Sequence, residues 1–224
     1  MIIAIDGPAG AGKSSVAQGA ARALGLAYID TGALYRAVGL AVIRGGGDPA
    51  REEDVLARLP GIELEVRYAK DGTQLVFLGE EDVSEAVRTP EASRASSDVA
   101  KLPAVRAFLL ELQRDLARAR DSILDGRDIG TVVIPNADVK IFLTASPEER
   151  ARRRWLELQS KGIEDSYGDV LAAVIARDEQ DTTRGAAPLK RAEDALLLDS
   201  TGMNLEQSVQ AVIALINKTR GNQS

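Results

Sequence analysis

The stretch that decides the fold is GPAGAGKSS, Gly7 to Ser15. It matches the pattern G-x-x-x-x-G-K-[ST] at Gly7, Gly12, Lys13 and Ser14. Apolar residues 2–5 precede it, and residues of good helix propensity follow it as far as Leu24, so the stretch lies between a predicted strand and a predicted helix. A glycine-rich turn without a ligand is the alternative. The pattern and its context together favour a loop whose backbone N–H groups bind a phosphate.

Such a loop predicts a nucleoside-triphosphate site. The Lys13 ammonium would bridge the β- and γ-phosphates, and the Ser14 hydroxyl would bind Mg²⁺. Asp30 and Asp125 each end an apolar run and are candidates to hold Mg²⁺ through water, although a turn residue at a strand end is an equally good interpretation of either. The residues expected to bind ATP are Gly7, Pro8, Ala9, Gly10, Ala11, Gly12, Lys13, Ser14 and Ser15.

Short apolar runs recur between helical patterns along the chain, and most of them end in Asp. They cover residues 2–6, 27–30, 123–125, 139–144 and 195–199. Runs of this kind, separated by helices, predict an α/β fold with a five-stranded parallel sheet covered by helices on both faces. Helix starts are indicated at Ser146, before Pro147 and Glu149, and at Asn204 with Gln207 three residues later.

One segment departs from this α/β pattern. Residues 62–78 alternate apolar and polar side chains around Asp71-Gly72, which predicts an antiparallel hairpin. We therefore expect a core of residues 1–58 and 100–224, interrupted by a small inserted subdomain over residues 59–99.

The composition restricts the classes of function. The chain has 224 residues and a formal net charge of −6, which disfavours nucleic acid and anionic membranes as partners. No apolar stretch approaches the roughly 18 residues of a membrane span, and no signal-peptide pattern opens the chain, so we expect a cytoplasmic protein. Cysteine is absent, which excludes disulfides and thiol chemistry. Histidine is also absent, so the chemistry does not use the commonest general base.

Arginines recur after the predicted strands and on one predicted helix. Arg36 and Arg127 follow strands, while Arg177, Asp181 and Arg184 have the spacing i, i+4, i+7 that places side chains on one stripe of a helix. Each arginine alone is typical of a solvated surface. Together they favour a second, phosphate-bearing substrate at the carboxyl edge of the sheet. A switch GTPase is disfavoured, because no N-K-x-D sequence is present.

Several segments resemble those of the bacterial cytidylate kinases, a family of P-loop nucleoside monophosphate kinases. They are IDGPAGAGKSS, IDTGALYRA, VRTPE, LDGRDIGTVVIPNADVKIFLTAS, EERARRR and LLLDST, in the order of that family and over essentially the whole chain. The resemblance implies the P-loop kinase fold, a monophosphate-binding insert that corresponds to the hairpin, and a lid over ATP at about residues 148–165. It also implies Mg²⁺-dependent transfer of the ATP γ-phosphoryl group to CMP or dCMP, giving CDP or dCDP and ADP. We expect a monomer.

The same resemblance assigns roles to single residues. The acceptor phosphate would be bound by Arg36, Arg127 and Arg184, the ribose by Arg177 and Asp181, and the cytosine by Ser97, Arg106 and Asp128. Thr31 would also contact CMP, Arg153 and Arg154 of the lid would reach ATP, and Lys13, Arg127, Arg177 and Arg184 would carry the catalysis. A one-residue shift to Ser96 stays open for Ser97.

The predicted reaction fits a chain without histidine. A nucleoside monophosphate carries about −1.5 to −2 charge at pH 7, so its attacking oxygen needs no general base. The obstacle is the repulsion between two polyanions, which lysine, arginine and Mg²⁺ reduce. Two alternatives remain at this point: a P-loop kinase for another monophosphate or a small metabolite, and a non-catalytic ATP-binding regulator.

Overall fold

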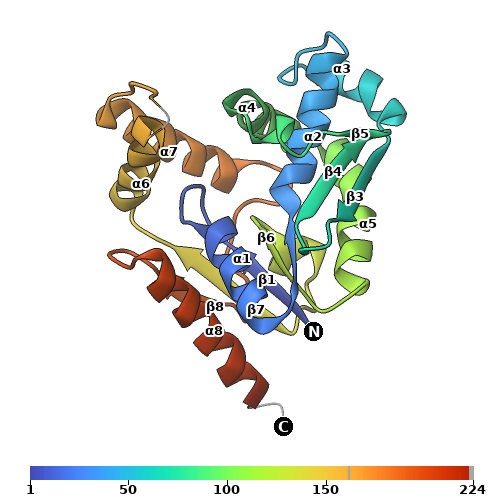
Figure 1. The fold of residues 1–224 in the computed structure, drawn as a ribbon. Helices are drawn as coiled ribbons and strands as arrows, with labels where there is room; N and C mark the ends of the chain where they lie inside the picture. Colours follow the sequence, from blue (N-terminus) through green and yellow to red (C-terminus); the bar gives the residue numbers. More distant parts are fainter. Residues whose placement is uncertain (161, 222–224) are drawn as a thin grey trace. The chain divides into compact units, whose positions relative to one another are not determined.

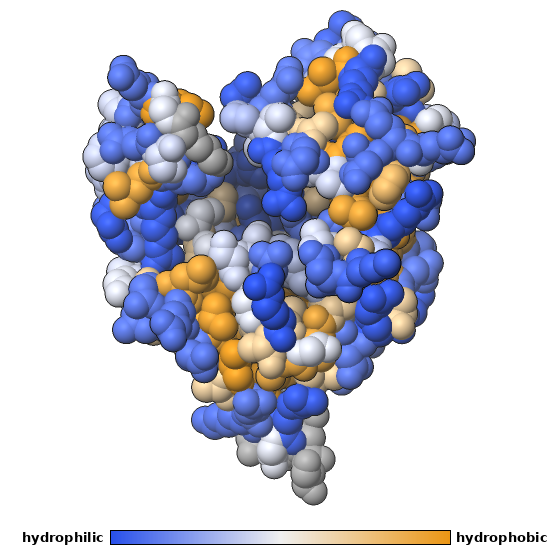
Figure 2. Space-filling model, in the orientation of Figure 1, coloured by the Kyte–Doolittle hydropathy of each residue, from blue (hydrophilic) through white to orange (hydrophobic). Residues whose placement is uncertain are grey.

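The computed structural model describes residues 1–160 and 162–221. The chain forms two compact units, the first made of Met1–Leu26 with Asp121–Ser224 and the second of Ala27–Arg120. No helix among the described residues is long and apolar enough to cross a membrane. Figure 2 shows that hydrophilic residues cover much of the face it presents, as expected for a chain with 28% charged residues.

The first unit is an α/β assembly whose helices pack on parallel strands (Figure 1). Helix α1 packs against α8, and helix α6 packs against α7. The elements are β1 (Ile2–Asp6), α1 (Lys13–Leu24), β6 (Ser122–Gly126), the π-helical turn η3 (Ile129–Val133), β7 (Val139–Thr144), α6 (Pro147–Ser160), α7 (Tyr167–Thr183), β8 (Leu196–Asp199) and α8 (Leu205–Gly221).

The second unit combines helices with a small antiparallel sheet. Its elements are β2 (Ala27–Asp30), α2 (Thr31–Arg44), α3 (Glu52–Arg58), η1 (Leu59–Gly61), β3 (Leu64–Tyr68), β4 (Gln74–Leu78), β5 (Glu81–Asp82), η2 (Ala86–Arg88), α4 (Pro90–Val99) and α5 (Pro103–Arg118). Helix α2 packs on α4 so closely that a Cβ on Gly39 would come within 2.6 Å of the Ala95 Cβ.

The predicted parallel sheet is confirmed. Its five strands have the order β2-β6-β1-β7-β8. Strand β1 lies between β6 and β7, with Ile3 paired to Ile123 on one side and to Val139 on the other. The side chains of Ile3, Ala4 and Ile5 are fully buried, as a central parallel strand covered on both faces requires.

The predicted hairpin is also confirmed, because β3 and β4 pair antiparallel with Tyr68 opposite Gln74. Its connection is longer than a two-residue turn: the N–H of Ala69 donates to the carbonyl of Thr73, and Gly72 adopts a positive φ of 83°. This is the three-residue loop that ends in a left-handed glycine. Strand β5 adds a third strand that the sequence pattern did not predict.

Both predicted helix starts are present. The Ser146 hydroxyl accepts a hydrogen bond from the N–H of Glu149 at 3.2 Å, which caps α6. Asn204 and Gln207 exchange backbone-to-side-chain bonds of 2.8 and 2.9 Å before α8, a complete capping box. The expected insert over residues 59–99 contains the antiparallel sheet, and the expected lid contains most of α6, while residue 161 lies outside the described residues. The boundaries of insert and lid stay predictions.

Candidate functional site

Glycines shape the backbone of residues 7–15, which we call the phosphate loop. Gly7 has φ 153°, and a Cβ at this position would lie 1.9 Å from the carbonyl oxygen of Leu143 in β7. Gly12 has φ 84° and caps the N-terminus of α1. Only glycine fits these two backbone conformations without strain, so the loop passes close to β7 and ends at a helix N-terminus, where N–H groups favour an anion.

The two polar side chains that begin α1 have definite partners. The Lys13 ammonium is buried and donates to the carbonyl of Pro8 at 2.7 Å. Burial lowers the pKa of Lys13 well below its ordinary value, and the nearby Arg127 lowers it further, while three neighbouring carboxylates act in the opposite direction. The Ser14 hydroxyl donates to Asp125 Oδ2 at 2.7 Å. The predicted loop and the end of β6 are therefore in contact.

Ser14 and Asp125 have the donor chemistry of a magnesium site. A hydroxyl and a carboxylate oxygen are hard ligands, and Mg²⁺ in phosphate-transfer sites takes one or two protein oxygens together with the substrate phosphates and water. Among the described residues no group of three His, Cys, Asp or Glu side chains could hold a metal by itself. The residues present thus fit an ion that arrives with a nucleotide.

Asp30, the other candidate for a metal ligand, forms hydrogen bonds with residues of the second unit. Its Oδ1 accepts from the N–H of Ala33 at 2.9 Å and caps α2, and its Oδ2 pairs with Arg36 at 2.7 Å. Both carboxylate oxygens therefore have partners within the second unit, so Asp30 acts there as a helix cap and as the ion-pair partner of Arg36.

A cluster of ion pairs lies at the carboxyl end of β6 and the C-terminus of α7. The buried Asp181 carboxylate accepts from Arg127 Nε at 2.9 Å and lies 3.5 Å from Arg177 Nε. Arg184 lies 3.8 Å from Asp181 and 3.6 Å from the buried Asp128 carboxylate. We call these five residues the arginine cluster. All five lie within Asp121–Ser224 of the first unit, whereas Arg36, the third arginine predicted for the acceptor phosphate, belongs to the second unit.

The electrostatics of the cluster favour an ionised Asp181 carboxylate. Burial by itself would raise the pKa of Asp181, but Arg127, Arg177 and Arg184 outweigh it and hold that pKa below its ordinary value. The prediction that Arg177, Asp181 and Arg184 share one helix is wrong for Arg184, because α7 ends at Thr183 and Arg184 has an extended ψ of 139°. It still reaches the same carboxylates, because it directly follows the last turn of the helix.

Asp6 joins the phosphate loop to the arginine cluster. Its carboxylate accepts hydrogen bonds from the N–H groups of Ile129 and Gly130 at 2.8 and 2.7 Å. Burial raises the pKa of Asp6 to about 6 in spite of these two bonds. The residue that ends β1 therefore holds the π-helical turn that follows Arg127 and Asp128.

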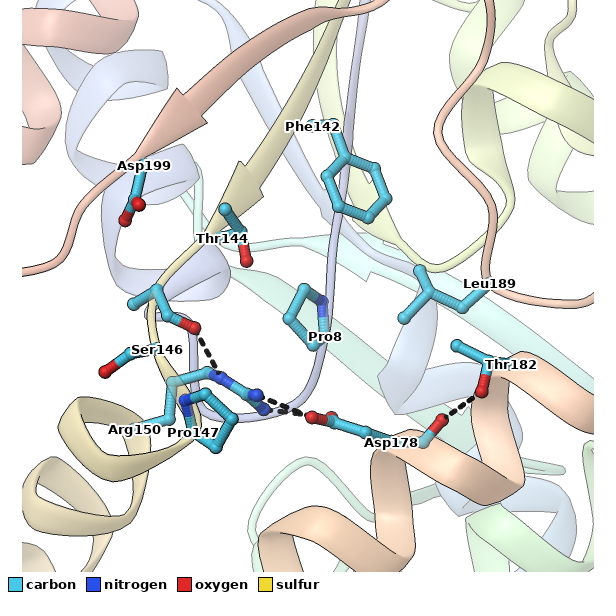
Figure 3. Close-up of a pocket in the computed structure, with 11 residues that line it drawn as sticks. Pro8, Phe142, Thr144, Ser146, Pro147, Arg150, Asp178, Thr182, Leu189 and Asp199 are labelled. Carbon is cyan, nitrogen blue, oxygen red and sulfur yellow. Dashed lines mark hydrogen bonds and ion pairs between the residues drawn. The ribbon is translucent and has the colours of Figure 1, made fainter.

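Arg150 supports the phosphate loop from the other side. Its guanidinium is buried and donates to the carbonyls of Ala145 and Ala9, each at 2.9 Å, and pairs with Asp178. Figure 3 shows this pair at the edge of a cavity of about 400 Å³, with Phe142 and Leu189 on its far side. Arg150 thus fixes the backbone of the loop at Ala9 and ties it to α7 through Asp178.

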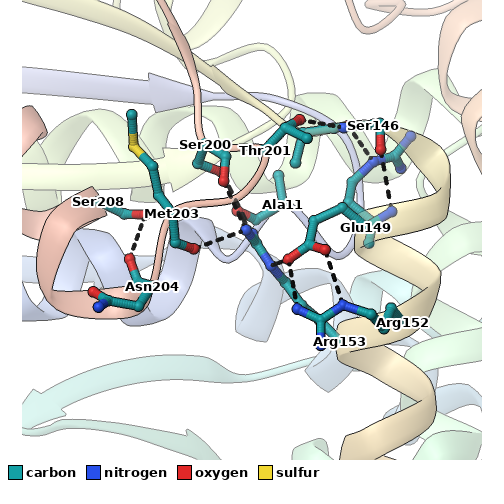
Figure 4. Close-up of polar contacts among 12 residues, drawn as sticks. Ala11, Ser146, Glu149, Arg152, Arg153, Ser200, Thr201, Met203, Asn204 and Ser208 are labelled. Carbon is teal, nitrogen blue, oxygen red and sulfur yellow. Dashed lines mark hydrogen bonds and ion pairs between the residues drawn. The ribbon is translucent and has the colours of Figure 1, made fainter.

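The two lid arginines predicted to reach ATP differ in their surroundings. Arg153 pairs with Glu149 at 2.9 Å and donates to the carbonyls of Ser200 and Met203 at 2.8 and 3.2 Å (Figure 4). It also lies 3.5 Å from the carbonyl of Ala11 in the phosphate loop. Arg154 is exposed and pairs with Glu157. Arg153 is therefore the better placed of the two for a nucleotide on the loop.

The second unit holds the remaining predicted residues. Thr31 is buried at the first position of α2, and Arg36 follows on the same helix. The Ser97 hydroxyl donates to the carbonyl of Ser93 at 3.3 Å, and Ser97 is buried, whereas Ser96 is part-exposed. The Arg106 guanidinium donates to the carbonyl of Ala100 and lies 5.6 Å from the centre of the Tyr35 ring. These residues lie on α2, α4 and α5, three helices of the second unit.

Known proteins match almost the whole length of this sequence. The family model described as cytidylate kinase matches residues 3–218. The chain is 48% identical over 221 residues to the cytidylate kinase of Caldicellulosiruptor bescii, which is 99% of this chain and 97% of that protein. It is 50% identical over 217 residues to the cytidylate kinase of Desulfitobacterium hafniense, which is 96% of this chain and 92% of that protein. The chain belongs to the cytidylate kinase family.

A solved structure supports the fold of this cytidylate kinase family member. An uncharacterized protein from Eubacterium ventriosum has a TM-score of 0.53 and 11% identity over 97% of this chain and 98% of that one. At this identity the likeness concerns the fold alone. Family membership makes the chain a kinase, so the regulator considered as an alternative is not supported.

Sequence reasoning about this cytidylate kinase family member missed Asp6 and Arg150. Each side chain forms hydrogen bonds with backbone groups that are distant in the sequence. Asp6 accepts from the N–H groups of Ile129 and Gly130, 123 and 124 positions away, and Arg150 donates to the carbonyl of Ala9, 141 positions away. A signal for Asp6 existed, since a carboxylate at the end of an otherwise apolar central strand must find hydrogen-bond donors when buried.

Proposed function

We propose that this chain transfers the γ-phosphoryl group of ATP to CMP or dCMP, with Mg²⁺, giving ADP and CDP or dCDP. One observation carries the proposal beyond family membership. The phosphate loop and the arginine cluster lie in one compact unit, and the cluster's Arg127 is near enough to Lys13 to lower its pKa. A loop for one phosphate group beside a separate cluster for another is what a phosphotransferase with two phosphorylated substrates requires.

The phosphate loop binds ATP in this proposal. The backbone of Gly7 to Ser15 surrounds the β-phosphate, and the Lys13 ammonium leaves the Pro8 carbonyl for the phosphates. That exchange is favourable, because a buried ammonium with a lowered pKa regains an anionic partner. Ser14 and Asp125 would hold Mg²⁺, which neutralises charge on the phosphates when it is bound.

The arginine cluster binds the acceptor. Arg127 and Arg184, with Arg36 of the second unit, contact the CMP phosphate, while Arg177 and Asp181 contact the ribose. Thr31, Ser97, Arg106 and Asp128 complete the CMP contacts, the last three at the cytosine. In support of these roles, Asp128 and Asp181 hold the guanidinium groups in place before any substrate arrives. Preorganised donors stabilise charge on the transferring group without reorganisation at the moment of reaction.

No general base is required from the protein. The second pKa of a nucleoside monophosphate is about 6, so its attacking oxygen is largely ionised at neutral pH. The side chains therefore act by positioning and by reducing charge repulsion. Lys13, Arg127, Arg177 and Arg184 carry that role, and Arg153 with Arg154 would contact ATP from α6.

The acceptor base gives the sharpest test. An Asp128 carboxylate accepts from the cytosine amine, whereas the uracil carbonyl would leave two acceptors facing each other, a mismatch worth up to about 10⁴-fold in kcat/KM. Asp128→Asn should narrow the ratio of kcat/KM for CMP to that for UMP, because the new amide can donate to the uracil carbonyl. The measurement is product formation from ATP, Mg²⁺ and each monophosphate, separated by chromatography.

Two controls accompany this measurement. Asp115→Asn changes an exposed carboxylate of α5, and the ratio should stay at the wild-type value. Lys13→Ala should remove most turnover with every acceptor. An unchanged ratio in Asp128→Asn would remove Asp128 from the base-reading residues, and preference of the wild type for another acceptor would overturn the proposed function.

A further inference from the structure

The second unit contains a buried polar side chain that none of these roles uses. Gln74 is the first residue of β4 and is 8% exposed. Its Oε1 accepts from the backbone N–H of Asp30 at 2.8 Å, and its Nε2 donates to the backbone carbonyl of Asp30 at 3.2 Å. The side-chain amide thus pairs with one residue's backbone as a neighbouring strand would.

Asp30 is the point where β2 ends and α2 begins. Its backbone is fixed by Gln74, and its carboxylate is fixed by the N–H of Ala33 at 2.9 Å. The other carboxylate oxygen pairs with Arg36 Nη2 at 2.7 Å. A continuous path of hydrogen bonds therefore runs from the hairpin, through Asp30, to the guanidinium of Arg36.

Arg36 keeps donors available for an anion. Its Nε is buried and has no hydrogen-bond partner among the described residues. The side chain as a whole is 23% exposed, so part of it is open to solvent. Because buried N–H groups are almost always paired, a guanidinium held on one edge by Asp30 and left with a free N–H is suited to bind a phosphate oxygen.

We propose that Gln74 is a positioning residue for Arg36, through which the hairpin sets the orientation of the guanidinium that binds the acceptor phosphate. The inference rests on the proposed function, because it is there that Arg36 contacts CMP. Gln74 itself touches no substrate. Its removal leaves the N–H and carbonyl of Asp30 without their partner at the start of α2, so the carboxylate and the arginine lose their fixed geometry.

The test uses Gln74→Met in the full chain, since methionine has a similar shape and makes no such hydrogen bonds. We expect KM for CMP to rise about 10-fold, as misplacement of a substrate-binding group does, while KM for ATP stays within about 2-fold. The matched control is Gln113→Met. Gln113 is a buried glutamine of α5 whose Nε2 donates to the carbonyl of Leu109, and no hydrogen bond among the described residues joins it to Asp30 or Arg36. KM for CMP should stay within about 2-fold of the wild type in this control.

A double-mutant cycle separates positioning from a general structural role. If Gln74 acts through Arg36, Gln74→Met should raise KM for CMP no further in an Arg36→Ala background. An additive effect, or equal rises in KM for CMP and ATP, would overturn the inference. Should Gln74→Met not fold, Gln74→Glu carries the same test, because it keeps the acceptor for the Asp30 N–H and loses the donor.

The failure of this inference is distinguishable from failure of the proposed function. If the wild type phosphorylates CMP and Arg36→Ala raises KM for CMP, while Gln74→Met leaves it unchanged, only the role of Gln74 is wrong. If the wild type does not phosphorylate CMP, the proposed function is wrong and the inference falls with it.

Discussion

The phosphate loop and the arginine cluster, the two sites that we propose for phosphate groups, are built by different means. In the loop the backbone makes the site, and two glycines with φ of 153° and 84° give it its shape. In the cluster, charged side chains from two segments make the site, and two buried carboxylates hold them. The backbone site depends on glycines, because a side chain at these positions would clash or strain the backbone. The side-chain site depends on the carboxylates that neutralise and hold its arginines.

This difference predicts different responses to mutation. The loop should fail when a side chain is added, because the added atoms meet backbone that cannot move aside. The cluster should fail when a charge is removed, because the remaining charges lose their partner. Three variants test the comparison, in decreasing order of expected effect.

Gly7→Ala should have the largest effect. The new Cβ would lie 1.9 Å from the Leu143 carbonyl oxygen at a φ of 153°. Backbone strain of about 1–3 kcal/mol and displacement of β7 at a similar cost together predict a loss of about 4 kcal/mol in the free energy of unfolding, measured with denaturant. Gly25→Ala is the control: φ is 67° and no atom lies within 4 Å of the new Cβ, so it should cost about 1–2 kcal/mol. Equal losses in both variants would contradict a site fixed by close backbone packing.

Asp181→Asn should have the next largest effect. The substitution leaves Arg127, Arg177 and Arg184 without the carboxylate that they share, and removing one partner of a buried pair costs about 3–5 kcal/mol. Because Arg127 and Arg177 are 23% and 29% exposed, we expect a loss near the lower end of that range in the free energy of unfolding. A saturating concentration of CMP should restore part of the loss. Stability within about 0.5 kcal/mol of the wild type would show that solvent, not Asp181, balances the arginines.

Asp6→Asn should have the smallest effect and one that depends on pH. The pKa of Asp6 rises from 3.8 unfolded to about 6 folded, so the folded chain binds more protons between these values, and its stability falls as pH rises through about 6. The rise corresponds to about 2–3 kcal/mol. The free energy of unfolding of Asp6→Asn minus that of the wild type should therefore increase by this amount from pH 4 to pH 7. A difference that stays constant with pH would show that Asp6 titrates normally, and that the contact between loop and cluster carries no buried charge.

Features with a local signature could be predicted from the sequence. The five strands, the hairpin at Asp71-Gly72 and the caps at Ser146 and Asn204 each depend on residues a few positions apart. The loop motif is local for the same reason, since Gly7 to Ser14 are consecutive in the chain. Backbone conformation is set by near neighbours, so a single sequence contains the required information.

Features that depend on distant partners could not be predicted. Gln74 pairs with Asp30 across 44 positions, and Arg127 pairs with Asp181 across 54. The sequence indicated that Arg127, Arg177 and Arg184 belong together, but not which carboxylate they share or that Arg184 lies beyond the helix. Such pairings follow from the packing of whole elements, and the residue types alone permit many other pairs.

The division of the chain into units also sets an order for synthesis. Strand β1 leads into the phosphate loop and leaves the ribosome before the strands it pairs with, because its hydrogen-bond partners β6 and β7 begin only at Ser122 and Val139. At about 5–20 residues per second, the apolar segment Ile2–Ile5 waits on the order of 10 s for them. The second unit, Ala27–Arg120, is continuous in the chain and is complete before that time. We therefore expect the second unit to become compact on the ribosome first, while the apolar strand that leads into the phosphate loop stays unpaired and exposed until β6 and β7 have emerged.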